Sequence, residues 1–253
     1  MLGAIIGDIA GSRFEFNNYR STDFDLFGEG CNYTDDSIMT LAVADAIMNN
    51  KPFGDTMRDY GKRFPCPMGG YGGRFAQWLR SDNPQPYNSF GNGSAMRVSP
   101  CALIAKDNRE RALSLAAQSA MPTHNHIEGV KGAMATTDAI LMAFGKAPKT
   151  EIRQKITSIY GYNLNFTCDE IRKTNTFNET CQVTVPQAIV AFLDSTDFEN
   201  AIKLAVSIGG DSDTIAAICG GIAEAYYGIP EQLKIKATNM LPVEFRKVIA
   251  KMI

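Results

Sequence analysis

The sequence has 253 residues, of which 25 are basic and 27 acidic, so the formal net charge is −2, and 45% of the residues are hydrophobic. These values are typical of a soluble globular protein and give no electrostatic reason for general binding to nucleic acid or to an anionic membrane. The only two histidines are His124 and His126. A histidine-rich metal site is therefore excluded, and carboxylates are expected to carry any chemistry.

The sequence gives no sign of export or of membrane insertion. The N-terminal run lacks a basic region and is interrupted by Asp8, which disfavours a secretory signal peptide. No stretch reaches the roughly 20 uncharged apolar residues that cross a bilayer. The six cysteines include no Cys-x-x-Cys pair, so we expect reduced thiols. We therefore expect a cytoplasmic protein with a single domain over residues 1–253, and we favour a monomer.

The first predicted element is a short apolar helix that contains Gly7 and Gly11. Residues four apart share one helix face, so these glycines predict close packing against another helix. Glu15 follows this helix and is either a surface acid or an acid near a functional site.

The motif Thr34-Asp35-Asp36-Ser37 directly precedes an apolar helical stretch over residues 35–49. Helix capping is the simplest interpretation, because Thr34 can accept backbone N–H bonds and acids in the first turn suit the helix dipole. The alternative is that these carboxylates belong to a functional site at the start of the helix.

Residues 64–92 lack a helical pattern, are rich in glycine and proline, and contain the only tryptophan, Trp78. A long ordered loop in a folded domain is usually a lid or a binding loop. We therefore predict a lid over this segment.

The glycine-rich stretch Ser89-Phe90-Gly91-Asn92-Gly93 leads into an apolar helical segment. Such a turn exposes backbone N–H groups that suit a phosphate or diphosphate. The spacing matches neither a Walker loop nor a dinucleotide-binding fingerprint. A plain connecting turn is the alternative, and Phe90 could either stack on a base or belong to the core.

Helices are predicted over residues 109–120 and 128–144, and both histidines lie in the stretch Thr123-His124-Asn125-His126 between them. One interpretation is a helix cap with partly exposed rings. The other is hydrogen bonding to a ribose or a phosphate. A metal site is disfavoured, because no third ligand is near in the sequence.

Residues 150–180 are polar, begin as a helix and become rich in asparagine and threonine. They form either a cap over a cleft or a surface excursion. β-branched alternation is scarce, and Cys181–Val185 is the best candidate for a short strand. The remaining pattern predicts an all-α fold, with helices over residues 185–193, 198–207, 214–227 and 230–239 and a last helix after Pro242.

A Gly-Gly turn brings Asp211, Asp213 and Thr214 to the start of an apolar helix. Capping is again possible, but two close carboxylates repel each other unless a proton or cation compensates. Their oxygens and the threonine hydroxyl suit Mg²⁺ or Mn²⁺. If this motif met the acids at the start of the 35–49 helix, the four carboxylates would form a two-metal site that could hold a water and polarise a substrate oxygen. Asp35 and Asp211 are 176 positions apart, so the sequence does not establish that the motifs meet.

The ordered set of motifs resembles the ADP-ribosylglycohydrolase family over residues 3 to about 229; the motifs are Gly7-Asp8 with Glu15, Thr34–Ser37, Gly91–Arg97, Thr123-His124 and Gly209–Thr214. The resemblance implies a compact all-α fold with two Mg²⁺ or Mn²⁺ ions at the bottom of a cleft. It also implies the metal ligands, which would be Thr34, Asp35, Asp36, Asp211, Asp213 and Thr214.

The resemblance further implies roles for other residues. Glu15 would gate the cleft or contact metal and substrate, and would be catalytic together with Asp35 and Asp36. Residues 64–88 would be the variable lid, in which a catalytic role for the only acid, Asp82, stays open. The diphosphate would be bound by Ser89, Gly91, Asn92 and Gly93. The adenosine side would be bound by Phe90, and the adenine-proximal ribose by His124 or His126.

The expected activity is metal-dependent hydrolysis of the N- or O-glycosidic bond between ADP-ribose and an acceptor, which is a modified protein side chain or a small molecule. The alternatives are a two-metal phosphohydrolase for a nucleotide-like substrate and a non-catalytic ADP-ribose-binding protein. The six intact ligand positions disfavour the non-catalytic protein. No general nucleic-acid or membrane partner is expected, and the acceptor itself is not predicted.

Overall fold

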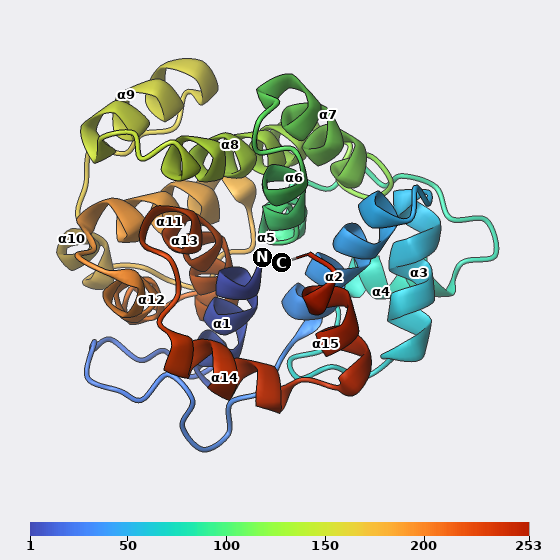
Figure 1. The fold of residues 1–253 in the computed structure, drawn as a ribbon, viewed down its shortest axis with the longest axis horizontal. Coiled ribbons are helices and arrows are strands. Elements are labelled where there is room, and N and C mark those ends of the chain that lie inside the picture. The colour runs from blue at the N-terminus through green and yellow to red at the C-terminus, as the bar shows by residue number, and fades with distance from the viewer. Residues whose placement is uncertain (253) are drawn as a thin grey trace.

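The computed structural model describes residues 1–252, and within them the protein is built from helices without a β-strand (Figure 1). This confirms the all-α prediction. None of these helices is long and apolar enough to cross a membrane. The elements in chain order are α1 (Leu2–Gly11), η1 (Ser12–Phe14), α2 (Asp35–Met48), α3 (Phe53–Arg63), α4 (Gly73–Arg80), α5 (Gly93–Met96), α6 (Ser99–Ile104), α7 (Arg109–Ala120), α8 (Ile127–Phe144), α9 (Lys149–Tyr160), α10 (Cys168–Arg172), α11 (Cys181–Asp194), α12 (Phe198–Ser207), α13 (Ser212–Tyr227), α14 (Glu231–Met240) and α15 (Val243–Ala250).

Helices α1 and α13 lie together at the centre of the fold, and every residue of α1 is buried. The glycines of α1 make this possible, because a Cβ on Gly7 would collide with the backbone of Ala216. A Cβ on Gly11 would lie 2.5 Å from the Cα of Asp213. The predicted close helix packing is therefore confirmed. The two helices run antiparallel, so the end of α1 meets the start of α13.

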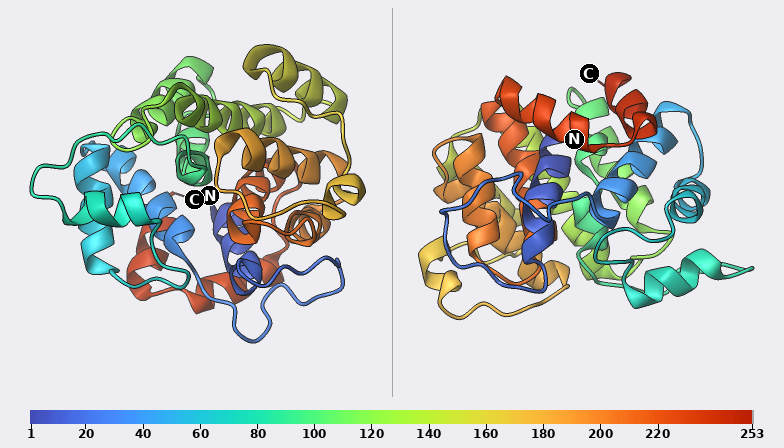
Figure 2. Two further views of the ribbon diagram at one scale, coloured as in Figure 1. Left: turned by 180° about the vertical axis from the view of Figure 1, so that it is seen from behind. Right: turned by 90° about the horizontal axis from the view of Figure 1, so that it is seen from below.

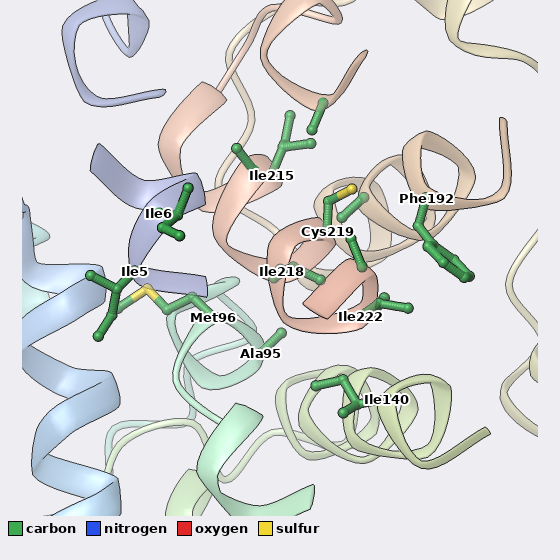
Figure 3. Close-up of a cluster of buried hydrophobic side chains, with 14 of the residues drawn as sticks. Ile5, Ile6, Ala95, Met96, Ile140, Phe192, Ile215, Ile218, Cys219 and Ile222 are labelled. Atoms are coloured by element: carbon green, nitrogen blue, oxygen red, sulfur yellow. The ribbon is translucent and has the colours of Figure 1, made fainter. Parts of the chain in front are cut away.

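The apolar core surrounds this helix pair. Ile5 and Ile6 of α1 and the isoleucines of α13 are almost completely buried. Figure 3 shows them beside side chains from α5, α8 and α11, among which are Met96, Ile140 and Phe192. Burying one such aliphatic side chain stabilises a fold by about 1.5–3 kcal/mol. This core therefore fixes the relative positions of helices that are far apart in the sequence.

Both termini lie on one side of the molecule, and α1 runs from that side toward the opposite one (Figure 2, right). Helix α2 also begins close to the end of α1, because Thr34 and Ser37 at its start donate hydrogen bonds to Asp8. Three helix ends therefore converge: the end of α1 and the starts of α2 and α13. On the same side lie α4 and the segment that precedes α11.

The predicted strand over Cys181–Val185 is wrong, because these residues form the first turns of α11. Cys181 packs so tightly against α8 that a Cβ on Gly132 would lie 2.5 Å from its Sγ. Cys181 and Val185 are both fully buried. Tertiary packing of a helix face therefore outweighs the preference of valine and threonine for strands.

The two segments without a clear pattern also contain helices. Residues 64–92 include the helix α4, so they are not one continuous loop. Residues 150–180 begin in a helix, α9, as predicted, and also contain α10. The remaining predicted helices are confirmed to within a few residues, from α2 through α15. Helix α3 was not predicted; its buried face is short and consists of Thr56, Met57, Tyr60 and Gly61.

Candidate active site

The converging helix ends bring the two predicted acidic motifs together. One carboxylate oxygen from each of Glu15, Asp211 and Asp213 lies within 4.8 Å of the others. The hydroxyl of Thr214 lies 3.4 Å from Oδ1 of Asp36, which joins the start of α13 to the start of α2. We call the five acids at these helix ends the acidic cluster; they are Glu15, Asp35, Asp36, Asp211 and Asp213.

The acidic cluster forms one wall of a cavity of about 280 Å³. The glycine-rich stretch forms another wall, and the beginning of the predicted lid also lines the cavity. The residues that line the cavity are Glu15, Phe16, Asp35, Asp36, Met39, Gly69, Gly70, Tyr71, Gly72, Gly73, Arg74, Phe75, Tyr87, Ser89, Gly91, Asn92, Gly93, Met96, Arg97, His124, Glu179, Asp211, Asp213 and Thr214. Most of the residues predicted to form the site therefore share one cavity.

Asp8 holds the start of α2 in place, a role that we did not predict. Its carboxylate accepts hydrogen bonds from the backbone N–H groups of Thr34 and Ser37, at 3.0 and 3.1 Å. It also accepts bonds from the hydroxyls of both residues. Thr34, a predicted metal ligand, thus donates its hydroxyl to Asp8 at 2.7 Å and lies outside the cavity lining. An acid in the middle of a fully buried apolar helix is the sequence signal for such an anchor.

Burial and repulsion between carboxylates raise the pKa values of four acids, Glu15, Asp35, Asp36 and Asp213. Burial raises the pKa of Glu15 to about 8, with further contributions from Asp211 and Asp8. The pKa values of Asp35, Asp36 and Asp213 are raised well above their usual range, first by burial and then by neighbouring carboxylates. Without a compensating charge, the protein therefore favours protonated acids at these positions.

The donor set fits a divalent cation. Oδ2 of Asp36 is buried and has no hydrogen-bond partner within residues 1–252, although buried carboxylate oxygens are normally paired. The surrounding ligand atoms are carboxylate and hydroxyl oxygens, which hard cations such as Mg²⁺ and Mn²⁺ prefer. A cation at this position would satisfy the unpaired oxygen and offset the repulsion between the acids.

The glycine-rich stretch is tied to the acidic cluster by Asn92. Its side-chain amide donates to Oδ2 of Asp211 at 2.6 Å and to the hydroxyl of Thr184 at 3.0 Å. Its backbone N–H donates to the carbonyl of Glu179 at 2.7 Å. Asn92 therefore orients Asp211 as well as lining the cavity, and its predicted role toward a diphosphate stays a prediction.

The structure separates the two histidines. His124 is buried, lines the cavity, and has its Nδ1 at 2.7 Å from the hydroxyl of Thr123. Burial, with Arg97 and Arg74 nearby, lowers its pKa well below the usual value. His126 instead caps α8, where its Nδ1 accepts the N–H of Glu128 at 3.1 Å.

Phe90 lies beside His126 and outside the main cavity. Their rings are 5.3 Å apart in an edge-to-face arrangement, and Phe90 is 42% exposed. It borders a neighbouring open groove together with Arg74, Phe177 and Glu179. The predicted contact of Phe90 with the adenosine side and that of His126 with the adenine-proximal ribose stay predictions.

The first part of the predicted lid lies directly over Glu15. Gly69 and Gly70 form a turn with positive φ angles of 75° and 83°, which favour glycine. A Cβ on Gly69 would also lie 2.5 Å from Oε2 of Glu15. Asp82, whose catalytic role was left open, is exposed and does not line the cavity.

The end of segment 150–180 reaches the cavity, whereas α9 packs against α8. Glu179 lines the cavity, and its pKa is raised by burial and by Asp211. The amide of Asn175 donates to the carbonyl of Gly209 at 2.8 Å, which fixes the turn before α13. Neither Glu179 nor Asn175 was predicted from the sequence to belong to the site.

Comparison with known proteins agrees with this geometry. The family model described as ADP-ribosylglycohydrolase matches residues 1–251. The chain is 26% identical to the ADP-ribosylhydrolase ARH3 of Danio rerio, with 90% of this chain and 82% of the relative covered. It is also 26% identical to the ADP-ribosylarginine hydrolase Tri1 of Pseudomonas putida strain GB-1, with coverages of 90% and 70%.

A solved structure described as an ADP-ribosylglycohydrolase-related protein complex has the same fold. It superimposes with a TM-score of 0.73 at 24% identity and covers 99% of this chain and 93% of that one. Fold and relatives together define a hydrolase that acts on glycosyl bonds. The chain belongs to the ADP-ribosylglycohydrolase family.

Proposed function

We propose that the protein uses divalent cations to hydrolyse the N- or O-glycosidic bond that joins ADP-ribose to an acceptor. One observation carries this proposal: a single cavity has the acidic cluster on one wall and the glycine-rich stretch on another. The first wall suits the ribose whose bond breaks, and the second suits the diphosphate. The names of the relatives, which include an ADP-ribosylarginine hydrolase, support this substrate class.

We propose two bound Mg²⁺ or Mn²⁺ ions. Asp35, Asp36, Asp211 and Asp213 would hold them with the hydroxyls of Thr34 and Thr214. The cations would supply Lewis acidity and orient a water near the anomeric carbon. Asp8 and Asn92 keep these ligands in place through their hydrogen bonds.

The acidic cluster would also act on the substrate directly. As the bond to the acceptor breaks, positive charge develops on the ribose ring, and a carboxylate-rich wall stabilises it. Glu15 lies next to the lid turn at Gly69 and lines the cavity, so its carboxyl group could contact a substrate bound there. With a pKa raised to about 8, Glu15 holds a proton at neutral pH in the metal-free protein.

A substrate panel tests the proposal. The purified protein is mixed with ADP-ribosylated arginine, serine, acetyl ester and nucleic-acid substrates, each with Mg²⁺, with Mn²⁺ and with EDTA. We expect release of intact ADP-ribose from at least one substrate, and we expect EDTA to stop it. No release from any of them would overturn the proposal.

The products also distinguish the alternatives. Release of AMP or free phosphate would indicate a two-metal phosphohydrolase. Tight ADP-ribose binding without turnover would indicate a binding protein. The Asp35→Ala and Asp213→Ala variants should lose both metal binding and turnover, and unchanged activity in both would refute the assigned ligands.

A further inference from the structure

Arg97, Thr123 and His124 form a buried chain of hydrogen bonds next to the glycine-rich stretch. Nη2 of Arg97 donates to the hydroxyl of Thr123 at 3.0 Å, and this hydroxyl lies 2.7 Å from Nδ1 of His124. The exposed fractions of the three residues are 1%, 0% and 6%. Arg97 is held in turn by the backbone carbonyl of Ser119 at 2.8 Å.

The position of each proton in this chain follows from the chemistry of the groups. A guanidinium group can only donate, so the Thr123 oxygen must accept from Arg97. The hydroxyl proton of Thr123 then needs an acceptor, because a buried polar group without a partner is costly. Within residues 1–252, Nδ1 of His124 is the one acceptor at hydrogen-bond distance. Nδ1 is therefore unprotonated, and the ring carries its proton on Nε2.

The ring is also electrically neutral. Burial and the positive charges of Arg97 and Arg74 lower the pKa of His124 well below its usual value. The neighbouring Tyr87, whose ring centroid is 6.1 Å away, offers no compensating charge, because burial raises its pKa to about 12. His124 is thus a fixed N–H donor rather than a cation.

The free Nε2 of His124 lies against the glycine-rich stretch. A Cβ on Gly93 would lie 3.2 Å from this atom, and a Cβ on Gly91 would lie 3.4 Å from it. Nε2 has no hydrogen-bond partner in the described part of the chain, and His124 lines the cavity. Its N–H group is therefore available to a ligand bound between this stretch and the acidic cluster.

We propose that Arg97 and Thr123 are positioning residues that lock His124 in its neutral Nε2–H tautomer. In this form His124 donates one hydrogen bond to a phosphate or ribose oxygen of bound ADP-ribose and takes no part in proton transfer. The identity of the ligand rests on the proposed function, whereas the tautomer does not. The glycines at positions 91 and 93 keep the space in front of the donor open.

The tautomer can be measured directly, because the protein has only two histidines. In a sample labelled with ¹⁵N-histidine at neutral pH, we expect His124 to show a pyridine-type Nδ1 and a pyrrole-type Nε2. Added ADP-ribose should shift the Nε2 and Hε2 signals of His124. His126, which caps α8 through its own Nδ1, serves as the internal reference. A protonated Nδ1 on His124 in the native protein would overturn the proposal.

Two matched variants test the role of the hydroxyl. Thr123→Val removes the hydroxyl at nearly constant shape, so we expect a mixed tautomer and about tenfold weaker ADP-ribose binding, the effect of losing one hydrogen bond. Thr123→Ser restores the hydroxyl and should restore both readouts. A purely structural role for Thr123 would lower the melting temperature but leave the ¹⁵N shifts of His124 unchanged, which would also overturn the proposal.

The two proposals fail in distinguishable ways. The ¹⁵N spectrum of His124 can be recorded without substrate. If His124 shows the expected tautomer but the protein hydrolyses no substrate of the panel, only the proposed function is refuted. Normal hydrolysis in a protein whose His124 carries its proton on Nδ1 would refute the positioning role alone.

Discussion

At the scale of single residues, burial makes the charged form of Asp35, Asp36 and Asp213 costly in free energy. Asp213 is 3% exposed, and burial and then the neighbouring charges of Asp211 and Asp36 raise its pKa. A divalent cation would relieve the same repulsion. Replacing one of these carboxylates by a neutral group should therefore raise the stability of the metal-free protein and lower the activity.

The Asp213→Asn variant tests this opposition. We expect its turnover to fall by at least about 100-fold, because the variant lacks a carboxylate that we propose as a metal ligand. In EDTA, its melting temperature should rise above that of the native protein, because asparagine, unlike aspartate, neither brings a charge into the fold nor has to take up a proton there. Asp107→Asn is the matched control, since Asp107 is exposed in a turn and does not line the cavity. Lower stability of Asp213→Asn in EDTA would contradict the expected repulsion.

Glu15 makes the metal-free protein sensitive to pH. Its pKa is raised from the ordinary value of 4.5 to about 8 in the fold, so the folded state binds the proton more tightly. The stabilisation is complete below pH 4.5 and is lost as the pH rises through about 8. In urea titrations with EDTA, the free energy of unfolding should fall more between pH 5 and pH 8 for the native protein than for Glu15→Gln. An equal decrease in the free energy of unfolding of both proteins would show that Glu15 is not the titrating group.

At the scale of elements, the contact between α1 and α13 has no room for a side chain on the glycine face. We expect Gly7→Ala to destabilise the protein by about 1–3 kcal/mol or more, because the new methyl group would force the helices apart. Gly73→Ala is the control, since a Cβ at this first residue of α4 would meet no atom within 4 Å. Urea denaturation of both variants checks the difference. Equal stability would show that α1 can shift without cost.

The sequence predicted most helices, because their apolar periodicity extends over several turns. It failed at Cys181–Val185, where the strand-like run Val183-Thr184-Val185 is overruled by packing of α11 against α8. It also missed α3 and α4, whose eleven and eight residues carry only a short periodic signal. Local propensity is a weak guide wherever tertiary contacts decide the conformation.

At the scale of the whole molecule, the site depends on contacts that local sequence patterns do not encode. The residue types at Asp35 and Asp211 indicated metal ligands, but their meeting follows from the antiparallel packing of α1 on α13. The glycine spacing predicted a close helix contact without naming the partner. Only the resemblance to a family implied that the motifs share one centre. Asp8, Asn92 and Glu179 acquire their roles from this convergence alone.

Cation binding should stabilise the whole fold. A ligand at 100 times its dissociation constant adds about 2.7 kcal/mol to the free energy of unfolding. We therefore expect Mg²⁺ or Mn²⁺ to raise the melting temperature of the EDTA-treated protein, and the rise should be absent in Asp35→Ala. NaCl at matched ionic strength is the control. An equal rise with NaCl would attribute the effect to general charge screening.

The central position of α1 also has a consequence for biosynthesis. Helix α1 leaves the ribosome about 200 residues before its partner α13, an interval of roughly 10–40 s at ordinary rates of translation. Its glycine face has no counterpart during that interval, and the end of α1 cannot yet meet Asp213. The fold is therefore completed late in translation, and a nascent chain interrupted before α13 has neither its central helix pair nor its complete acidic cluster.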